Sequence, residues 1–211
     1  QVPSSNLGAG TINITTERKK MLSDLPIDRI DAESTRHKQI DQFLLQDIPN
    51  KNIADIIISE GDMQHDKTNL KCAMTDWYIH LKFNEIEKLT TRITDLINKQ
   101  EQFGVAIDWI MDQSWGAVYN KGEGSISHSH VPYGKSFVYY VQAEEGSSPL
   151  VFDRTYVKNR QVIIKPKTGL LVVFPSDLEH SVPDSTMQQQ RVILSGNLFL
   201  LPKNIELQYK C

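Results

Sequence analysis

The chain has 211 residues, of which 39% are hydrophobic and 23% charged, and its net charge is -3. This composition is typical of a globular protein, and the slightly negative charge argues against a nucleic-acid partner. No apolar run approaches the roughly 20 residues that span a bilayer, and the first residues do not form a secretory signal. With two cysteines, Cys72 and Cys211, we expect no disulfide framework and a reducing, cytoplasmic setting.

The first sixty residues predict a polar arm followed by helices. Residues 1–20 are rich in Ser, Gly and Thr, and we expect an extended arm there. Between Asp31 and Ile48 the apolar positions recur at helical spacing, which predicts a helix that ends at Pro49. A shorter helical turn is expected at residues 53–57.

The clearest helical pattern begins at Asn84. We expect Asn84 to be the N-cap, with Glu87 reaching back to it as in a capping box. The apolar stripe that follows has the spacing of one buried helix face and consists of Ile86, Leu89, Ile93, Leu96 and Ile97.

After Gln102 the pattern changes to short apolar runs separated by Gly, Pro, Asn and Asp, which predicts strands. The expected strands lie at residues 115–119, 137–141, 150–152, 162–164, 170–174 and 192–194. Helices followed by many short strands indicate an α+β fold that is mainly β, a sandwich or jelly-roll with flanking N-terminal helices. We expect a single domain over residues 21–211, with a helical part at about 31–102 and a jelly-roll core at about 103–205.

Three of the six histidines stand out by their spacing. His128 and His130 are two residues apart, so on a strand both side chains would point to the same face. His180 follows a buried-looking run and could meet them from a later strand. Imidazole ligands suit Zn, Cu, Fe or Ni, and the absence of a CxxC motif argues against a closed structural zinc site. The pattern therefore predicts an open metal site, and the alternative is a set of histidines on an exposed face or in ordinary hydrogen bonds.

Arg191 lies eleven residues after His180, at the start of an apolar run. A guanidinium offers a rigid fork that pairs with a carboxylate through two hydrogen bonds. Ser195 and Asn197 follow at alternating spacing, so we expect them to share a strand face with Arg191. A cation beside an open metal site predicts an anionic co-substrate.

Residues 114–198 resemble the core of the 2-oxoglutarate/Fe(II)-dependent dioxygenases. The resemblance rests on the order and spacing of several blocks, and the order is similar to that of the prolyl-hydroxylase-like branch. Within that branch it is most similar to uncharacterised bacterial and phage proteins with a His-x-His-x-Pro block, which for a phage-encoded member implies the host cytoplasm. The blocks are Ser-Trp-Gly-Ala-Val-Tyr at 114–119, His-Ser-His-Val-Pro at 128–132, Ser-Phe-Val-Tyr-Tyr-Val at 136–141, Gly-Ser-Ser-Pro-Leu-Val-Phe at 146–152, Lys-Thr-Gly-Leu-Leu-Val-Val-Phe-Pro-Ser at 167–176 and Arg-Val-Ile-Leu-Ser-Gly-Asn at 191–197.

The resemblance implies a double-stranded β-helix and an iron site. His128 and His180 would be iron ligands, and His130 stands where most members carry the carboxylate of a His-x-Asp pair. His130 would therefore either complete a three-histidine site or leave that position to water. Asp153 is the nearest downstream carboxylate that could substitute, although we expect it to be exposed.

The resemblance also implies a binding site for 2-oxoglutarate. Arg191 would grip its far carboxylate, supported by Ser195, with Asn197 on the same strand face. Tyr140 would reach the co-substrate while Tyr139 faces the other way, and Tyr119 would line the same region.

The activity that we expect is that of a 2-oxoglutarate-dependent hydroxylase, with Fe(II), 2-oxoglutarate and oxygen as cofactor and co-substrates. Its target would be a peptidyl residue such as proline, or a small metabolite. Desaturation or halogenation at the same iron is an alternative outcome. The competing classes are a non-enzymatic, cupin-like metal- or ligand-binding module and an accessory viral protein that retains the fold without activity.

Overall fold

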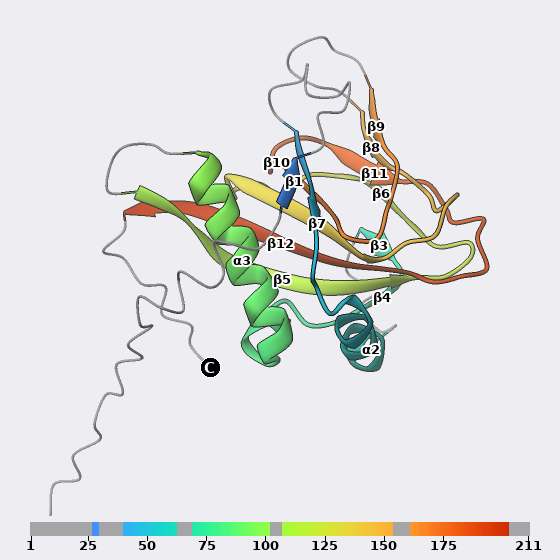
Figure 1. The fold of residues 1–211 in the computed structure, drawn as a ribbon. Helices are drawn as coiled ribbons and strands as arrows, with labels where there is room; N and C mark the ends of the chain where they lie inside the picture. The colour runs from blue at the N-terminus through green and yellow to red at the C-terminus, as the bar shows by residue number, and fades with distance from the viewer. Residues whose placement is uncertain (1–26, 30–39, 63–68, 102–106, 154–160, 203–211) are drawn as a thin grey trace, which may run out of the picture.

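The computed structural model describes residues 27–29, 40–62, 69–101, 107–153 and 161–202 (Figure 1). The predicted N-terminal arm and the first part of the helix expected from Asp31 lie outside these residues, as does Cys211. None of the described helices is long and apolar enough to cross a membrane.

The described chain forms two antiparallel sheets and two α-helices (Figure 1). The larger sheet has seven strands in the order β1-β2-β10-β7-β12-β5-β4, and the smaller has five in the order β3-β6-β11-β8-β9. The elements in chain order are β1 Ile27–Arg29, β2 Asp41–Leu45, α2 Asn50–Glu60, β3 Leu70–Lys71, β4 Ala73–Met74, the 3-10 turn η2 Ile79–Leu81, α3 Asn84–Gln100, β5 Ile107–Tyr119, β6 Gly124–His128, β7 Lys135–Gln142, β8 Leu150–Phe152, β9 Val162–Ile164, β10 Leu170–Pro175, β11 His180–Val182 and β12 Arg191–Pro202.

The larger sheet is buried on both faces, which explains the continuous apolar runs of its central strands. On β7, the side chains of Phe137, Tyr139 and Val141 join a core under the helices, whereas Val138 and Tyr140 face the smaller sheet. The Tyr139 hydroxyl donates to Asn50 Oδ1 at 2.8 Å and so connects this strand to α2. The alternation confirms that Tyr139 and Tyr140 point in opposite directions.

Helix α3 covers the outer face of the larger sheet (Figure 1), and its predicted apolar stripe is buried in the core below it. The predicted capping box is wrong. Asn84 is the first residue of the helix, the N-cap is Phe83, and no side chain caps that end. The backbone N–H of Glu87 instead donates to the Phe83 carbonyl oxygen at 2.9 Å, so the first turn closes with backbone groups.

The helix predicted between Asp31 and Ile48 is also wrong over its described part. Residues 41–45 form strand β2, which pairs with both β1 and β10. Phe43 and Leu45 are buried in the core under the helices, and Gln42 is buried as well. Pairing with two neighbouring strands therefore outweighs a helical spacing that was carried by few apolar residues. With β3 and β4, this strand also places sheet structure inside the region expected to be helical.

Candidate functional site

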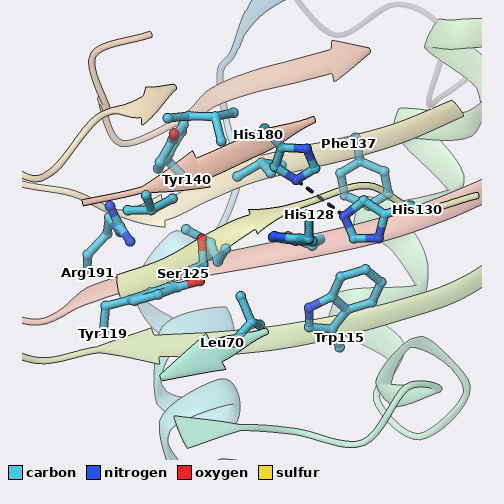
Figure 2. Close-up of a pocket in the computed structure, with 15 residues that line it drawn as sticks. Leu70, Trp115, Tyr119, Ser125, His128, His130, Phe137, Tyr140, His180 and Arg191 are labelled. Carbon is cyan, nitrogen blue, oxygen red and sulfur yellow. Dashed lines mark hydrogen bonds between the residues drawn. The ribbon is translucent and has the colours of Figure 1, made fainter. Parts of the chain in front are cut away.

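A narrow pocket of about 30 Å³ lies between the two sheets. Every residue that the sequence predicts for the site lines it, apart from Asn197 (Figure 2). The histidines come from the smaller sheet and its loops, and Arg191 comes from the larger sheet. The two-sheet arrangement thus places candidate metal ligands opposite the Arg191 guanidinium.

His128 and His180 meet because their strands are paired. His128 ends β6, His180 begins β11, and the two residues are direct partners in the antiparallel register. Their ring centroids are 4.5 Å apart. Phe174 packs edge-on against His180 at 4.8 Å, so that the imidazole is oriented by an aromatic neighbour.

The tautomers of these two histidines follow from their own backbone contacts. His128 Nδ1 lies 2.8 Å from the Ile126 carbonyl oxygen, and His180 Nδ1 lies 2.9 Å from that of Leu178. A carbonyl oxygen accepts only, so Nδ1 carries the proton in both rings. In neutral imidazoles this leaves the Nε2 lone pairs free to bind a metal.

His130 joins the pair from a loop and not from the strand. Strand β6 ends at His128, so a shared strand face does not bring His130 to the site as the sequence predicted. The His130 N–H donates to the Ser176 carbonyl oxygen at 2.7 Å, which ties the His130 loop to the turn before His180. The side chain still converges on the pair, with His130 Nε2 3.3 Å from His180 Nε2.

This separation fits a hydrogen bond between the two rings and equally fits two ligands on one ion. Two nitrogens about 2.1 Å from a metal, at angles of about 90–109°, lie about 3.0–3.4 Å apart. One ligand atom from each of the three histidines falls within 4.8 Å of the others. Asp153 is not part of this group, and its carboxylate accepts a hydrogen bond from the Ser127 hydroxyl at 2.7 Å.

Burial keeps the three imidazoles neutral. It lowers the pKa of His128, and together with the neighbouring histidines it lowers the pKa of His130 to about 3 and that of His180 to about 4. Metal ligation requires the neutral ring. The three residues are therefore in the ligating form at neutral pH without having to lose a proton.

Arg191 is a buried cation whose hydrogen-bonding capacity is mostly unused. The side chain is 3% exposed, and Nη1 donates to the Ser148 carbonyl oxygen at 2.6 Å. The guanidinium lies over the ring of Tyr119 at 4.1 Å. Nε and Nη2 find no acceptor among the described residues. A buried charge without a counter-charge is expensive, so this group is suited to an anionic ligand.

Two tyrosines and a serine surround Arg191 from adjacent strands. Tyr119 is its direct partner on β5, and Tyr140 on β7 pairs with Ile193 two residues further along β12. Burial raises the pKa of Tyr140 to about 12 and that of Tyr119 well above its ordinary value, so both remain neutral. Ser195 also lines the pocket.

Asn197 is not brought together with these residues. Its Oδ1 accepts a hydrogen bond from the Ser136 hydroxyl at 2.8 Å, and the Ser136 and Ser176 hydroxyls are 2.7 Å apart. All three residues are buried. Ser176 in this cluster is also the residue whose carbonyl accepts from the His130 N–H. The contacts of Asn197 therefore support the loop that carries His130 and not the pocket lining.

The site matches the groups that the sequence resemblance implies. Three neutral imidazoles suit a divalent transition metal, and the unpartnered Arg191 nitrogens suit a carboxylate. The pocket therefore presents groups suited to a transition metal on one side and to an anionic ligand on the other.

Comparison with known proteins bears on this assignment. Residues 113–197 match the family model described as "Putative 2OG-Fe(II) oxygenase". No curated protein sequence matches the chain. The match covers less than half of the chain and confirms the resemblance to this family on which the fold was predicted. The family implies Fe(II) and 2-oxoglutarate, and the described histidines could hold the metal.

Solved structures share the fold at low sequence identity. The viral collagen prolyl hydroxylase of Paramecium bursaria Chlorella virus-1 is 16% identical with a TM-score of 0.56, and the match covers 84% of this chain and 97% of that one. A Pseudomonas putida prolyl-4-hydroxylase is 18% identical with a TM-score of 0.60, over 79% and 95% of the two chains. The non-heme α-ketoglutarate-dependent epimerase SnoN from nogalamycin biosynthesis is 11% identical with a TM-score of 0.59, over 86% and 83%. The double-stranded β-helix is thereby confirmed.

The sequence does not indicate the contact that holds Arg191, and for Trp115 it leaves a place at the substrate mouth and core packing as alternatives. The Ser148 carbonyl that holds Arg191 belongs to a Gly-Ser-Ser-Pro segment that indicates only a turn between strands. Trp115 lines the pocket beside His130, with ring centroids 5.6 Å apart. Its position on a predicted strand is compatible with core packing alone, so the sequence does not show which way the indole points.

Proposed function

We propose that the protein is an Fe(II)- and 2-oxoglutarate-dependent oxygenase that hydroxylates a peptidyl residue, such as proline, or a small metabolite. The observation that carries the proposal is one pocket with two complementary halves. On one side three neutral imidazoles converge, and on the other a buried guanidinium has two nitrogens without an acceptor among the described residues.

In this proposal His128, His130 and His180 hold the iron. His128 and His180 present Nε2 because each Nδ1–H is engaged by a backbone carbonyl. A carbonyl behind a ligating histidine fixes the ring and its tautomer. His130 takes the place of the usual carboxylate, so the bound ion keeps its full charge of +2 toward its remaining ligands.

Arg191 binds the far carboxylate of 2-oxoglutarate. Its guanidinium is held by the Ser148 carbonyl and the Tyr119 ring, so it is already oriented before the ligand arrives. Ser195 and Tyr140 line the same half of the pocket and offer hydroxyl groups to this carboxylate. Asn197 remains a predicted co-substrate residue, although its contacts favour a role in holding the histidine loops.

The iron, once bound, supplies the redox chemistry in which oxygen oxidatively decarboxylates 2-oxoglutarate to succinate and CO₂ and hydroxylates a C–H bond of the substrate. The protein contributes the ligands, the orientation of the co-substrate and a pocket lined in part by apolar and aromatic side chains. The likeness to two prolyl hydroxylases supports a peptidyl target. The likeness to an epimerase keeps other outcomes at the same centre open, and desaturation or halogenation belong among them.

The competing proposal is a cupin-like module that binds a metal or ligand without turnover, or an accessory protein that has kept the fold. The buried guanidinium favours the oxygenase, because a metal-storage site does not need an unpaired cation across the pocket. Anaerobic titration with Fe(II) and then 2-oxoglutarate tests the site directly, and succinate formation in air against a panel of peptides and metabolites tests the activity.

We expect Fe(II) and 2-oxoglutarate to bind together and to give slow succinate formation even without the true substrate. The reaction should disappear in His180→Ala, because two imidazoles hold a metal weakly. It should also disappear when Zn(II) replaces Fe(II), because zinc has no redox chemistry. A protein that binds metal tightly yet makes no succinate with any of the panel would favour the binding module.

A further inference from the structure

Besides Arg191, the pocket contains a second side chain with an unused hydrogen-bond donor. Trp115 on β5 is 4% exposed and lines the pocket. Its indole Nε1–H finds no acceptor among the described residues. A buried donor is normally paired, because leaving it unpaired is destabilising. A donor of this kind inside a ligand pocket points to a partner on the ligand.

The indole ring is clamped in one orientation. Its centroid lies 5.6 Å from that of His130 and 4.9 Å from that of Trp77, and the Trp77 ring is inclined to it by 65°. Figure 2 shows the nitrogen-bearing edge of Trp115 turned toward Leu70 and the middle of the pocket. The six-membered ring lies on the side of His130.

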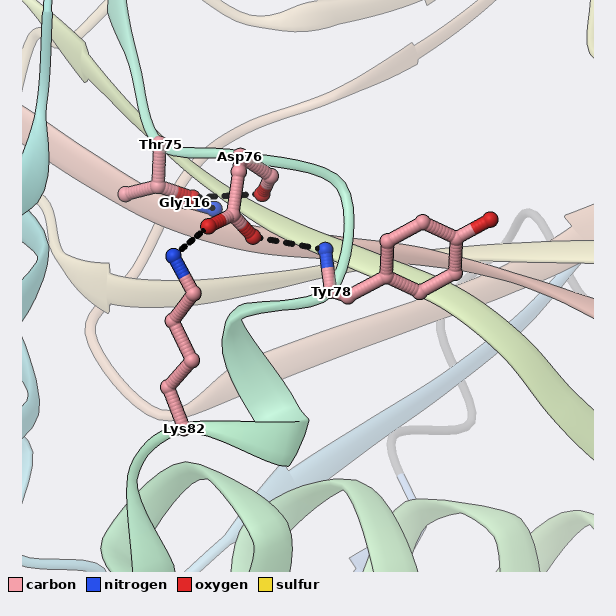
Figure 3. A network of polar contacts seen from close by, with 5 residues as sticks. All are labelled: Thr75, Asp76, Tyr78, Lys82 and Gly116. Atoms are coloured by element: carbon pink, nitrogen blue, oxygen red, sulfur yellow. Dashed lines mark hydrogen bonds and ion pairs between the residues drawn. The ribbon is translucent and has the colours of Figure 1, made fainter. Parts of the chain in front are cut away.

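The segment that carries Trp77 is itself fixed against β5. The Thr75 hydroxyl accepts from the Gly116 N–H at 2.9 Å and donates to the Asp76 carbonyl (Figure 3). The Asp76 carboxylate accepts from the Tyr78 N–H at 2.8 Å and pairs with Lys82. The Trp77 carbonyl accepts from the Ser114 N–H at 2.9 Å. These contacts flank Trp115 on both sides, so the indole is preorganised as a donor.

The strand register orders the two donors along the pocket. Arg191 on β12 is opposite Tyr119, and Ser195 is opposite Trp115, so Trp115 and Arg191 stand four residues apart along paired strands. At about 3.3 Å per residue this is about 13 Å between backbones. Trp115 is at the His130 end and Arg191 at the other. The unpartnered nitrogens of both are donors, so the matching ligand carries acceptors at both ends.

We propose that the Trp115 indole N–H donates a hydrogen bond to the carboxylate at the 2-oxo acid end of 2-oxoglutarate. The assignment rests on the proposed function, in which Arg191 holds the other carboxylate. It makes Trp115 a co-substrate-binding residue. A carboxylate is the acceptor to which a neutral N–H bonds most strongly, and the position of Trp115 beside a candidate metal ligand places the indole at that end.

The test compares two indole deletions. Trp115→Phe keeps an aromatic ring against His130 and removes the N–H. Trp109→Phe is the matched control, because the Trp109 N–H donates to Glu101 at 2.9 Å and the residue does not line the pocket. Calorimetry of the Ni(II)-loaded full chain measures 2-oxoglutarate binding without turnover. We expect affinity to fall about 10- to 100-fold in Trp115→Phe, as for the loss of a hydrogen bond to a charged group, and to stay unchanged in Trp109→Phe.

A second ligand identifies the end that Trp115 contacts. 2-Oxopentanoate keeps the 2-oxo acid and lacks the far carboxylate, so Trp115→Phe should weaken its binding by a similar factor. A loss confined to 2-oxoglutarate would place the indole at the Arg191 end and overturn the assignment. Should Trp115→Phe fail to fold, 3-benzothienylalanine at position 115 keeps both rings and replaces the N–H with sulfur, and the same loss is expected.

The possible failures are distinguishable. If Ni(II)-loaded wild-type protein does not bind 2-oxoglutarate, the proposed function is wrong and this assignment falls with it. If wild type binds and Trp115→Phe binds equally well, the function stands and the role of Trp115 is wrong.

Discussion

Replacing Arg191 with methionine should remove co-substrate binding without lowering the stability of the ligand-free protein. The side chain is 3% exposed and has one hydrogen-bond acceptor, the Ser148 carbonyl. Methionine fills a similar volume and carries no charge. Because the guanidinium is buried with two nitrogens unpartnered among the described residues, its removal relieves a desolvation penalty.

The opposing free energies can be compared. The effective penalty for burying an ion is several kcal/mol. Against it stand the bond to Ser148, about 1.5–3 kcal/mol, and the contact with the Tyr119 ring, about 2 kcal/mol when desolvated. We therefore expect the free energy of unfolding of Arg191→Met to be unchanged or up to about 3 kcal/mol higher, within the range measured when buried ions are replaced by apolar residues.

Urea unfolding of the metal-free protein measures this difference, with an unchanged m-value as the check that the two proteins expose the same surface. The affinity for 2-oxoglutarate should fall by about 2–5 kcal/mol, as when one partner of a buried charge pair is removed. Arg92→Met is the matched control, because Arg92 is equally buried on α3 and does not line the pocket. A loss of more than about 2 kcal/mol of stability with unchanged co-substrate affinity would refute the reasoning, since the guanidinium would then be a structural group.

Three further changes give measurable outcomes. His130→Asp should still bind Co(II) or Fe(II). His130→Ala should stay folded but lose more metal affinity than the 10- to 100-fold that is typical for removing a group behind a ligand. Unchanged metal affinity in the alanine variant would assign that coordination position to water. Gly116→Ala should destabilise by about 1–3 kcal/mol in urea unfolding, because its Cβ would lie 2.5 Å from Ile57 Cγ2; if that contact is the cause, Gly116→Ala should cost less when it is made in an Ile57→Ala background. Burial raises the pKa of Cys72 to about 12. In a Cys211→Ser background at pH 8, the Cys72 thiol of the folded protein should therefore react with iodoacetamide about a thousandfold more slowly than that of the protein unfolded in urea. Equal rates would show that the thiol is accessible in the folded protein.

The elements that could be predicted are those whose pattern is local and long. The stripe from Ile86 to Ile97 specifies α3 because one helix face is buried over its whole length. The apolar strand runs are equally clear because the larger sheet is covered on both sides. Strand β2 could not be predicted, since the partners that make it a strand, β1 and β10, are not visible in its own sequence.

The residues of the candidate site also divide into those that the sequence reveals and those that only tertiary contacts place. His128, His180 and Arg191 carry chemistry that is rare in a core, so their residue types and spacing identify them. The position of His130 depends on a backbone contact with Ser176, a residue 46 positions later in the numbering. The direction of the Trp115 indole depends on the segment around Trp77. Such contacts are set by tertiary packing and leave no periodic signal.

The backbone contacts that hold His128, His130 and His180 in place also affect which metal ion the protein would bind. The His130 N–H donates to the Ser176 carbonyl, and the Nδ1 atoms of His128 and His180 are held by backbone carbonyls, so the candidate ligands are assembled before any ion arrives. A prebuilt set of neutral imidazoles ranks divalent ions by intrinsic affinity, and in that order Fe(II) stands below Ni(II), Cu(II) and Zn(II). Protein purified from cells would then carry whichever ion the cell or the column supplied. Iron occupancy would be decided by metal availability in the cell and not by the fold.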